Sequence, residues 1–171
     1  MWLEFLEHFN GVSPFRDQGW HDNDSLELYI DAAASIGFGG FFSGSWFQGK
    51  WSPEQLDRLL SIAYCEFYPV VIAVHCWAPW LAICKVRFRT DNEAVVHIIN
   101  KQSSHCYRIM QLVRLFVCHC LRYNITCRAI HVPGAHNDIA DSLSRFQMTR
   151  FRSLVPQADV KMTPIPTLFQ V

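Results

Sequence analysis

The stretch KVRFRTDNEAVVHIIN, residues 85–100, contains the change of period that decides the fold class. Its first half alternates, because Val86, Phe88 and Thr90 fall on one face of an extended chain, and it then reaches Asp91. Its second half spaces apolar residues as one face of a helix does. The stretch therefore predicts a strand that ends in an aspartate and passes directly into a helix.

Toward the C-terminus the same alternation of elements repeats. Residues 108–123 have a helical pattern, residues 125–133 are extended, and HVPGAHNDIADSLSR, residues 131–145, reads as a strand end, a turn and a helix start. Asn137 is the predicted cap of that helix, and Asp141 lies one turn into it. Strands separated by helices predict parallel pairing through right-handed crossovers, with ligand sites at the carboxyl ends of the strands.

Toward the N-terminus the pattern changes to that of a meander. Residues 26–31, LELYID, alternate and end in an aspartate, and the glycine-rich and aromatic residues 37–51 predict two further antiparallel strands. Residues 66–82 predict a buried central helix. Pro69 is expected in its first turn, where a missing N–H removes no bond, and Glu66 then lies at or just before that turn.

The longest stretch without a formal charge, residues 67–84, raises the alternative of a membrane span. His75 and Pro79 within it, and flanks without a positive bias, argue against a span, so we expect no membrane partner. Seven cysteines, an odd count without the spacing of a disulfide framework, predict a reducing compartment, either the cytosol or the nucleus.

Length and composition predict one globular domain, since the chain has 171 residues of which 50% are hydrophobic. The order of predicted strands and helices makes it an α/β domain. We expect a mixed five-stranded sheet, with an antiparallel meander followed by parallel strands, flanked by helices. Residues 1–24 are expected to form an N-terminal helix and a connecting segment. Residues 25–146 would form the domain itself, and residues 147–171 a proline-containing tail or linker.

The net charge of zero conceals an asymmetry along the chain. Residues 1–40 hold seven acidic residues against Arg16 alone, whereas residues 85–128 hold eight basic residues against Asp91 and Glu93. The basic segment either faces a polyanion or forms an ordinary solvated surface, and charge alone leaves both alternatives open.

Four carboxylates fall where the predicted elements begin or end. Asp31 and Asp91 stand at strand ends, and two more stand near helix starts, Glu66 and Asp141. If all four converge on one edge of the sheet, they repel each other unless cations lie between them. Hard oxygen ligands select Mg²⁺ or Mn²⁺, and two such ions can hold a phosphodiester.

The order of these motifs resembles the type I ribonuclease H domain of retroelement reverse transcriptases. The four motifs are LYIDAAASIGFGG, YCEFYPVV, RFRTDNEAVVHIIN and VPGAHNDIADSLSR. The last is similar to the VPG..N..AD.LSR ending of long-terminal-repeat elements. The DN.AVV..IN pattern and the W..FL..FNG segment resemble the DIRS-like, tyrosine-recombinase-encoding retrotransposons. The resemblance extends from Trp2 to about Pro166, and four motifs in order with compatible spacing are a specific signal.

The resemblance implies a ribonuclease H-like fold and a metal-dependent endonuclease that hydrolyses the RNA strand of RNA–DNA hybrids. It implies two Mg²⁺ or Mn²⁺ ions at an Asp-Glu-Asp-Asp site. Asp31 would contact both ions, Glu66 and Asp91 would complete the shell of one, and Asp141 would hold the other.

The resemblance also implies roles for residues around this site. Asn137 matches an asparagine that helps to position substrate, and either His131 or His136 would assist product release. The expected substrate-binding residues are Asn92, Asn137, Arg87, Arg89, Lys101 and Arg108. In the parent element, the partner would be the polymerase domain of a reverse transcriptase.

Two departures from the family pattern accompany the match. Ala33 stands where many relatives have a serine, and no lysine-rich helix follows the central helix, which predicts weak intrinsic affinity for substrate. The alternative function is a catalytically silent scaffold or nucleic-acid-binding remnant of a retrotransposon, and a DNA-directed nuclease of the same fold is a third reading. All four carboxylates are present, which favours the enzyme, because decay usually removes one of them.

Overall fold

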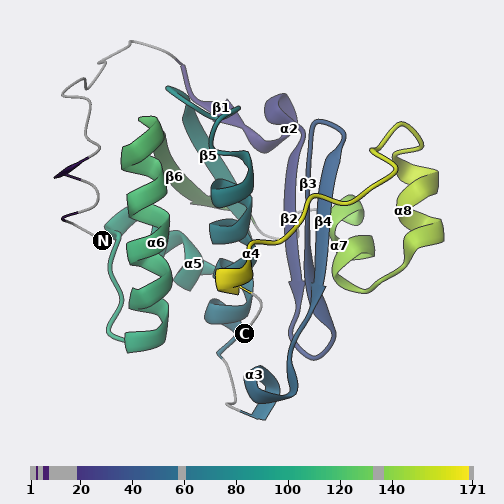
Figure 1. The fold of residues 1–171 in the computed structure, drawn as a ribbon, viewed down its shortest axis with the longest axis horizontal. Coiled ribbons are helices and arrows are strands. Elements are labelled where there is room, and N and C mark those ends of the chain that lie inside the picture. The colour runs from purple at the N-terminus through teal and green to yellow at the C-terminus, as the bar shows by residue number, and fades with distance from the viewer. Residues whose placement is uncertain (1–2, 4–5, 8–18, 58–60, 133–136, 170–171) are drawn as a thin grey trace.

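The structure is a computed structural model, and it describes residues 3, 6–7, 19–57, 61–132 and 137–169 (Figure 1). Most of the predicted N-terminal helix lies outside these residues. The strands are β1 (His21–Asp22), β2 (Leu28–Ala33), β3 (Gly37–Phe42), β4 (Ser45–Lys50), β5 (Lys85–Thr90) and β6 (Thr126–His131). The helices are α2 (Asn23–Leu26), α3 (Pro53–Asp57), α4 (Ile62–Trp77), α5 (Glu93–Lys101), α6 (Tyr107–Tyr123), α7 (Asp138–Ser144), α8 (Met148–Leu154) and the short 3₁₀ helix η1 (Thr167–Phe169).

The described strands form two three-stranded sheets. Strands β2, β3 and β4 form an antiparallel meander in that order, and β1, β5 and β6 form a parallel sheet with β5 in the centre. The predicted meander and the parallel pairing of the later strands are thus confirmed. The predicted single five-stranded sheet is wrong, because β2 and β5 belong to different sheets.

The segment before β2 accounts for the separation of the two sheets. In β1, His21 lies opposite Val86 of β5, and α2 contacts both β2 and β5. Arg89 of β5 holds this segment through ion pairs of 2.9 Å with Asp24 and 3.4 Å with Asp22. β5 therefore pairs with a two-residue strand that is too short to produce a periodic signal in the sequence.

Two predicted boundaries are also wrong. β2 begins at Leu28 and continues to Ala33, so Asp31 lies within the strand and not at its end. The central helix α4 begins directly after Ser61, whose hydroxyl accepts a 3.2 Å hydrogen bond from the backbone N–H of Tyr64. Pro69 consequently lies inside the helix. Glu66, predicted at or just before the first turn, lies in the second turn. Burial of α4 on all sides outweighs the backbone hydrogen bond that proline cannot donate.

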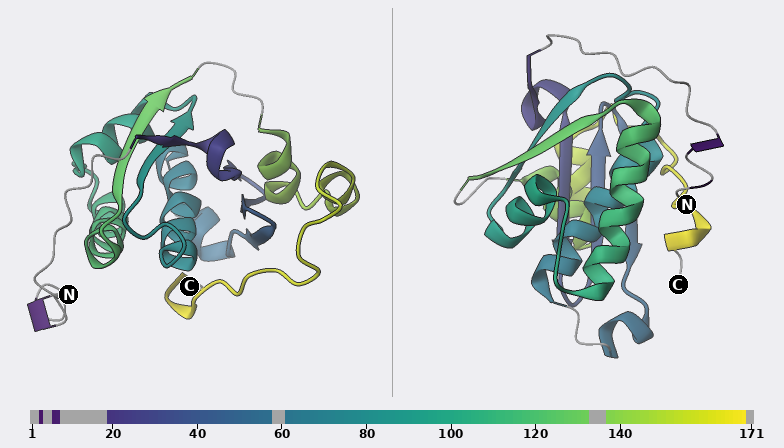
Figure 2. Two further views of the ribbon diagram at one scale, coloured as in Figure 1. Left: turned by 90° about the horizontal axis from the view of Figure 1, so that it is seen from above. Right: turned by 90° about the vertical axis from the view of Figure 1, so that its left-hand side faces the viewer.

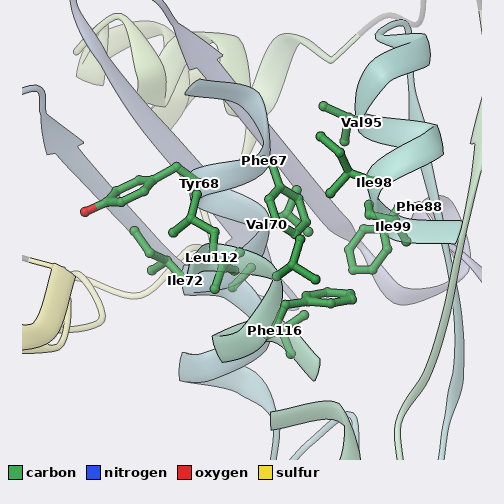
Figure 3. Packing of buried hydrophobic residues seen from close by; sticks show 14 of the residues in the cluster. Phe67, Tyr68, Val70, Ile72, Phe88, Val95, Ile98, Ile99, Leu112 and Phe116 are labelled. Atoms are coloured by element: carbon green, nitrogen blue, oxygen red, sulfur yellow. The ribbon is translucent and has the colours of Figure 1, made fainter. Parts of the chain in front are cut away.

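Helix α4 lies on one side of the β2–β4 sheet, and α7 and α8 lie on the other (Figures 1 and 2). A hydrophobic cluster fills each side. The larger cluster joins the sheet to α4, α5 and α6 and includes the fully buried Phe116 (Figure 3). The smaller cluster joins Phe41 and Trp46 of the sheet to Leu143 of α7 and Phe151 of α8. The burial of α4 confirms the predicted central helix, and no helix within the described residues is long and apolar enough to cross a membrane.

Residues 147–169, the predicted tail or linker, are packed as a strap on the domain. The strap begins with α8 and then passes along β4, where the N–H of Thr163 donates a 2.7 Å hydrogen bond to the carbonyl of Trp46. Its end lies on α4, where the hydroxyl of Tyr68 donates a 2.6 Å hydrogen bond to the carbonyl of Phe169. The backbone hydrogen bond to Trp46 satisfies a group of β4, an edge strand that would otherwise present it unpaired.

Candidate functional site

A cavity of about 260 Å³ lies between β2 and β5. Its wall includes three of the four predicted carboxylates, Asp31 of β2, Glu66 of α4 and Asp91 after β5. Asn137, directly before α7, and Arg89 also line it, together with the polar residues Asp24, Tyr29 and Thr90. The fold therefore gathers at one place groups that are far apart in the sequence.

Asp31 lies on the face of β2 that α7 covers. Its Oδ2 accepts a 2.6 Å hydrogen bond from the hydroxyl of Ser144. The net pKa of Asp31 is raised, and burial is the largest cause. The charge of Asp141 raises it further, whereas the hydrogen bond from Ser144 and the charge of Arg145 lower it. The protein therefore compensates the charged form of Asp31 only in part, which is the condition in which a carboxylate gains from a bound cation.

Glu66 and Asp91 extend the same cluster of negative charge. Burial raises the pKa of Glu66, and this effect is opposed by a hydrogen bond with Asn92 and reinforced by the charges of Asp91 and Asp31. Asp91 is exposed in the bend between β5 and α5. Because Glu66 interacts with both aspartates, the three carboxylates form one electrostatic unit.

Asp141 is neutralised by the protein itself. Its Oδ1 accepts a 2.6 Å hydrogen bond from Arg145 Nε, and its Oδ2 accepts one of 2.8 Å from Arg150 Nη1. Partial burial alone would raise the pKa of Asp141, but the hydrogen bonds and charges of the two arginines hold it below the ordinary value. Arg150 also pairs with Asp138. Asp141 acts electrostatically on Asp31 but does not line the cavity.

Ser144, Arg145 and Arg150 are absent from the sequence prediction. Ser144 and Arg145 follow Asp141 by three and four residues, and in a helix this spacing places side chains on neighbouring positions of one face. That spacing is the signal that could have identified them. Arg150 belongs to α8, a helix that the sequence pattern does not predict, and only the folded chain brings it to Asp141.

Asn137 stands at the N-cap position of α7, so the predicted helix start is confirmed. Its side chain makes no capping hydrogen bond to the helix. Its Nδ2 instead donates a 2.7 Å hydrogen bond to the carbonyl of Ile30, directly before Asp31. Its Oδ1 is buried and has no hydrogen-bond partner among the described residues. The side chain thus ties α7 to β2 and leaves an acceptor available beside the cavity.

The two predicted histidines have separate outcomes. His131 is exposed at the end of β6, and its Nε2 lies 3.1 Å from the carbonyl oxygen of Asp91. It therefore contacts the backbone of the carboxylate cluster and does not line the cavity. His136 lies outside the described residues.

The predicted substrate-binding residues are dispersed. Asn92 caps α5, since its Oδ1 accepts hydrogen bonds from the N–H groups of Ala94 and Val95 at 3.0 and 3.2 Å. Arg87 and Arg89 form ion pairs with acidic residues of the segment before β2. Two further basic residues are exposed on α5 and α6 and do not line the cavity, Lys101 and Arg108.

The donor chemistry of the cavity fits a hydrated hard cation. All the candidate ligands are oxygen atoms, and two of the carboxyls have raised pKa values. Within residues 19–57, 61–132 and 137–169, Asn137 Oδ1 is a buried acceptor without a partner. In the observed side-chain orientations, no three acidic, histidine or cysteine groups among the described residues are close enough to enclose an ion. Binding would therefore require the other carboxylates to move toward Asp31, which Ser144 already holds, and Asp141 to exchange an arginine for the ion.

Neither a known family model nor a curated protein sequence matches this chain. Among solved structures, the chain is similar to ribonuclease H1 from the halophilic archaeon Halobacterium salinarum NRC-1, with a TM-score of 0.54 and 14% sequence identity. The similarity covers 76% of this chain and 99% of that chain. The strand and helix order described above is therefore that of a ribonuclease H-like fold.

Proposed function

We propose that this protein is a metal-dependent endoribonuclease that hydrolyses the RNA strand of RNA–DNA hybrids. The observation that carries the proposal is the cavity in which Asp31, Glu66 and Asp91 meet within a ribonuclease H-like fold. Two carboxyls whose pKa values are raised, first by burial and then by neighbouring carboxylates, are typical of functional sites, because a structure selected for stability alone avoids burying such groups together. The retrotransposon origin and the polymerase partner are part of the same proposal and rest on the motif resemblance.

The proposed ligands for two Mg²⁺ or Mn²⁺ ions are Asp31, Glu66, Asp91 and Asp141. Bound ions would supply charge stabilisation at the phosphodiester and an activated water. Asn137 Oδ1 would accept a hydrogen bond at the cavity wall, since no group in the described part of the chain donates to it. His131, exposed beside the Asp91 backbone, is the candidate group for product release. The 2′-hydroxyls of the RNA strand would distinguish it from DNA.

A silent scaffold is the second candidate function, and one observation favours it. Both carboxylate oxygens of Asp141 are engaged by arginines, as in a structural ion-pair network rather than an open metal site. A scaffold of this kind would bind hybrids without cutting them. The two candidates therefore differ in a measurable product.

The test is a cleavage assay on matched substrates of one sequence: an RNA–DNA hybrid, duplex RNA, duplex DNA and single-stranded RNA. We expect cuts within the RNA strand of the hybrid, dependent on Mg²⁺ or Mn²⁺, with 5′-phosphate and 3′-hydroxyl ends. Asp91→Asn should abolish cleavage, whereas Asp138→Asn, which alters an exposed residue away from the cavity, should not. Hybrid binding without any cleavage would support the scaffold, and equal cutting of single-stranded RNA would indicate another class of nuclease.

A further inference from the structure

Ser144 is a fully buried serine in the last turn of α7, the helix that carries Asp141. Its hydroxyl oxygen lies 2.6 Å from Asp31 Oδ2 and 3.1 Å from the carbonyl of Asp141. A hydroxyl has one hydrogen to donate, and the nearer, charged acceptor forms the stronger bond. The hydroxyl therefore links α7 to the carboxylate of β2 and does not only satisfy its own helix.

A second serine of the same helix provides the contrast. Ser142 is also fully buried, but its hydroxyl donates a 2.6 Å hydrogen bond to the carbonyl of Ile139, within α7 itself. Buried serines in helices commonly bond to a carbonyl one turn earlier. Ser142 follows that pattern, and Ser144 departs from it toward the candidate site.

The close seat of α7 on the sheet makes the contact possible. Asp31 lies opposite Gly39 in the register of β2 and β3. A Cβ atom on Gly39 would lie 2.4 Å from the Cβ of Leu143 and 3.0 Å from the backbone N of Ser144. The glycine therefore allows α7 to approach β3 closely enough for the hydroxyl of Ser144 to reach the carboxylate.

We propose that Ser144 is a positioning residue that fixes the orientation of the Asp31 carboxylate for metal binding. The inference rests on the proposed function, because it assigns to Ser144 a role toward the same site. The hydrogen bond engages Oδ2 of Asp31 and restricts rotation of the carboxylate, so that Oδ1 has a defined position. Groups that hold a metal ligand from behind in this way reduce the reorganisation that binding requires.

The test compares Ser144→Ala with the matched variant Ser142→Ala. Each removes one buried hydroxyl from α7, so both should lower the melting temperature similarly. We expect Ser144→Ala alone to weaken Mn²⁺ binding, measured by titration calorimetry, by about 10-fold or more. We also expect it to lower kcat on the hybrid while KM stays unchanged, and Ser144→Thr, which restores a hydroxyl, to recover part of both losses.

A metal-free crystal structure of each variant gives a readout that does not depend on activity. The Asp31 carboxylate should occupy more than one orientation in Ser144→Ala and a single one in Ser142→Ala. If the two variants match in Mn²⁺ affinity, kcat and carboxylate order while the parent is active, the assignment of Ser144 is overturned and the proposed function stands. If the parent neither binds Mn²⁺ nor cleaves the hybrid, the proposed function fails, and the metal role of Ser144 fails with it.

Discussion

Replacement of Gly39 by alanine is expected to disturb both the stability and the activity of this protein. The φ angle of Gly39 is not positive, so alanine is acceptable to the backbone and any effect comes from contact alone. The added Cβ would lie 2.4 Å from the Cβ of Leu143, about 1 Å short of the 3.4 Å at which ordinary contact begins. Because the neighbour is a helix packed into the core, α7 must withdraw from β3 by about that distance.

The withdrawal has two calculable consequences. Overpacking of a core costs about 1–3 kcal/mol of unfolding free energy, which for a domain of this size lowers the melting temperature by roughly 2–12 °C. The hydrogen bond of 2.6 Å between Ser144 and Asp31 would lengthen beyond the range of a hydrogen bond. A misplacement of about 1 Å in a catalytic constellation costs on the order of 100-fold in rate.

The assay combines thermal melting with single-turnover cleavage of an RNA–DNA hybrid. The control is Gly19→Ala, because no atom lies within 4 Å of a Cβ at that position. The control should melt and cleave as the parent does. If Gly39→Ala behaved like Gly19→Ala in both measurements, α7 would not be seated on β3 as described, and the argument for the site geometry would be refuted.

Three further predictions concern charge. The folded-state pKa values of Asp31 and Glu66 are raised, so the stabilisation from their protonation is fully present below the ordinary carboxyl pKa of about 4 and is lost as pH rises through the folded values. The metal-free melting temperature should therefore fall across that pH window. A melting temperature that instead rises steadily with pH would contradict the raised pKa values. Asp31→Asn should abolish cleavage yet raise the metal-free melting temperature at neutral pH. The rise should be about 2–4 °C if removing the buried negative charge stabilises the folded state by about 1 kcal/mol. A lower melting temperature would show that the charge of Asp31 does not destabilise the fold. Asp22→Asn should release Arg87 from its ion pair and remove one of the two carboxylates that hold Arg89, which keeps its 2.9 Å pair with Asp24. Hybrid binding measured by fluorescence anisotropy should therefore strengthen at low salt and depend more steeply on salt. Asp138→Asn, which removes the same charge elsewhere, should leave the salt dependence unchanged.

Local pattern alone determined most of the longer strands and helices of this chain. The alternation around Val86 and Phe88 predicts β5, and both side chains are buried in the structure. The helical spacing that follows predicts α5, and the glycine- and aromatic-rich meander predicts β3 and β4. These elements are predictable because period and burial face are properties of neighbouring residues. The order of the four carboxylates along these elements is equally a property of the sequence.

The tertiary structure alone decided how the elements meet. The pairing of β1 with β5, which separates the two sheets, depends on ion pairs between residues about 65 positions apart, such as Arg89 and Asp24. The sequence pattern predicts Pro69 in the first turn of a helix, but it lies inside α4. Burial of the helix offsets the one hydrogen bond that proline cannot donate. Both outcomes depend on contacts between residues far apart in the sequence, which a local pattern does not include.

The candidate site shows the same division. The sequence predicts Asp31, Glu66 and Asp91 as site residues, and all three line one cavity in the structure. It also predicts Asp141, but the arginines that neutralise this residue are positioned by the packing of α7 and α8. The hydrogen bond from Ser144 to Asp31 joins residues 113 positions apart and depends on a glycine in a third element. The sequence therefore determined which carboxylates the site contains and their order. The neutralisation of Asp141 and the orientation of Asp31 depend on side chains that only the folded structure brings within hydrogen-bonding distance.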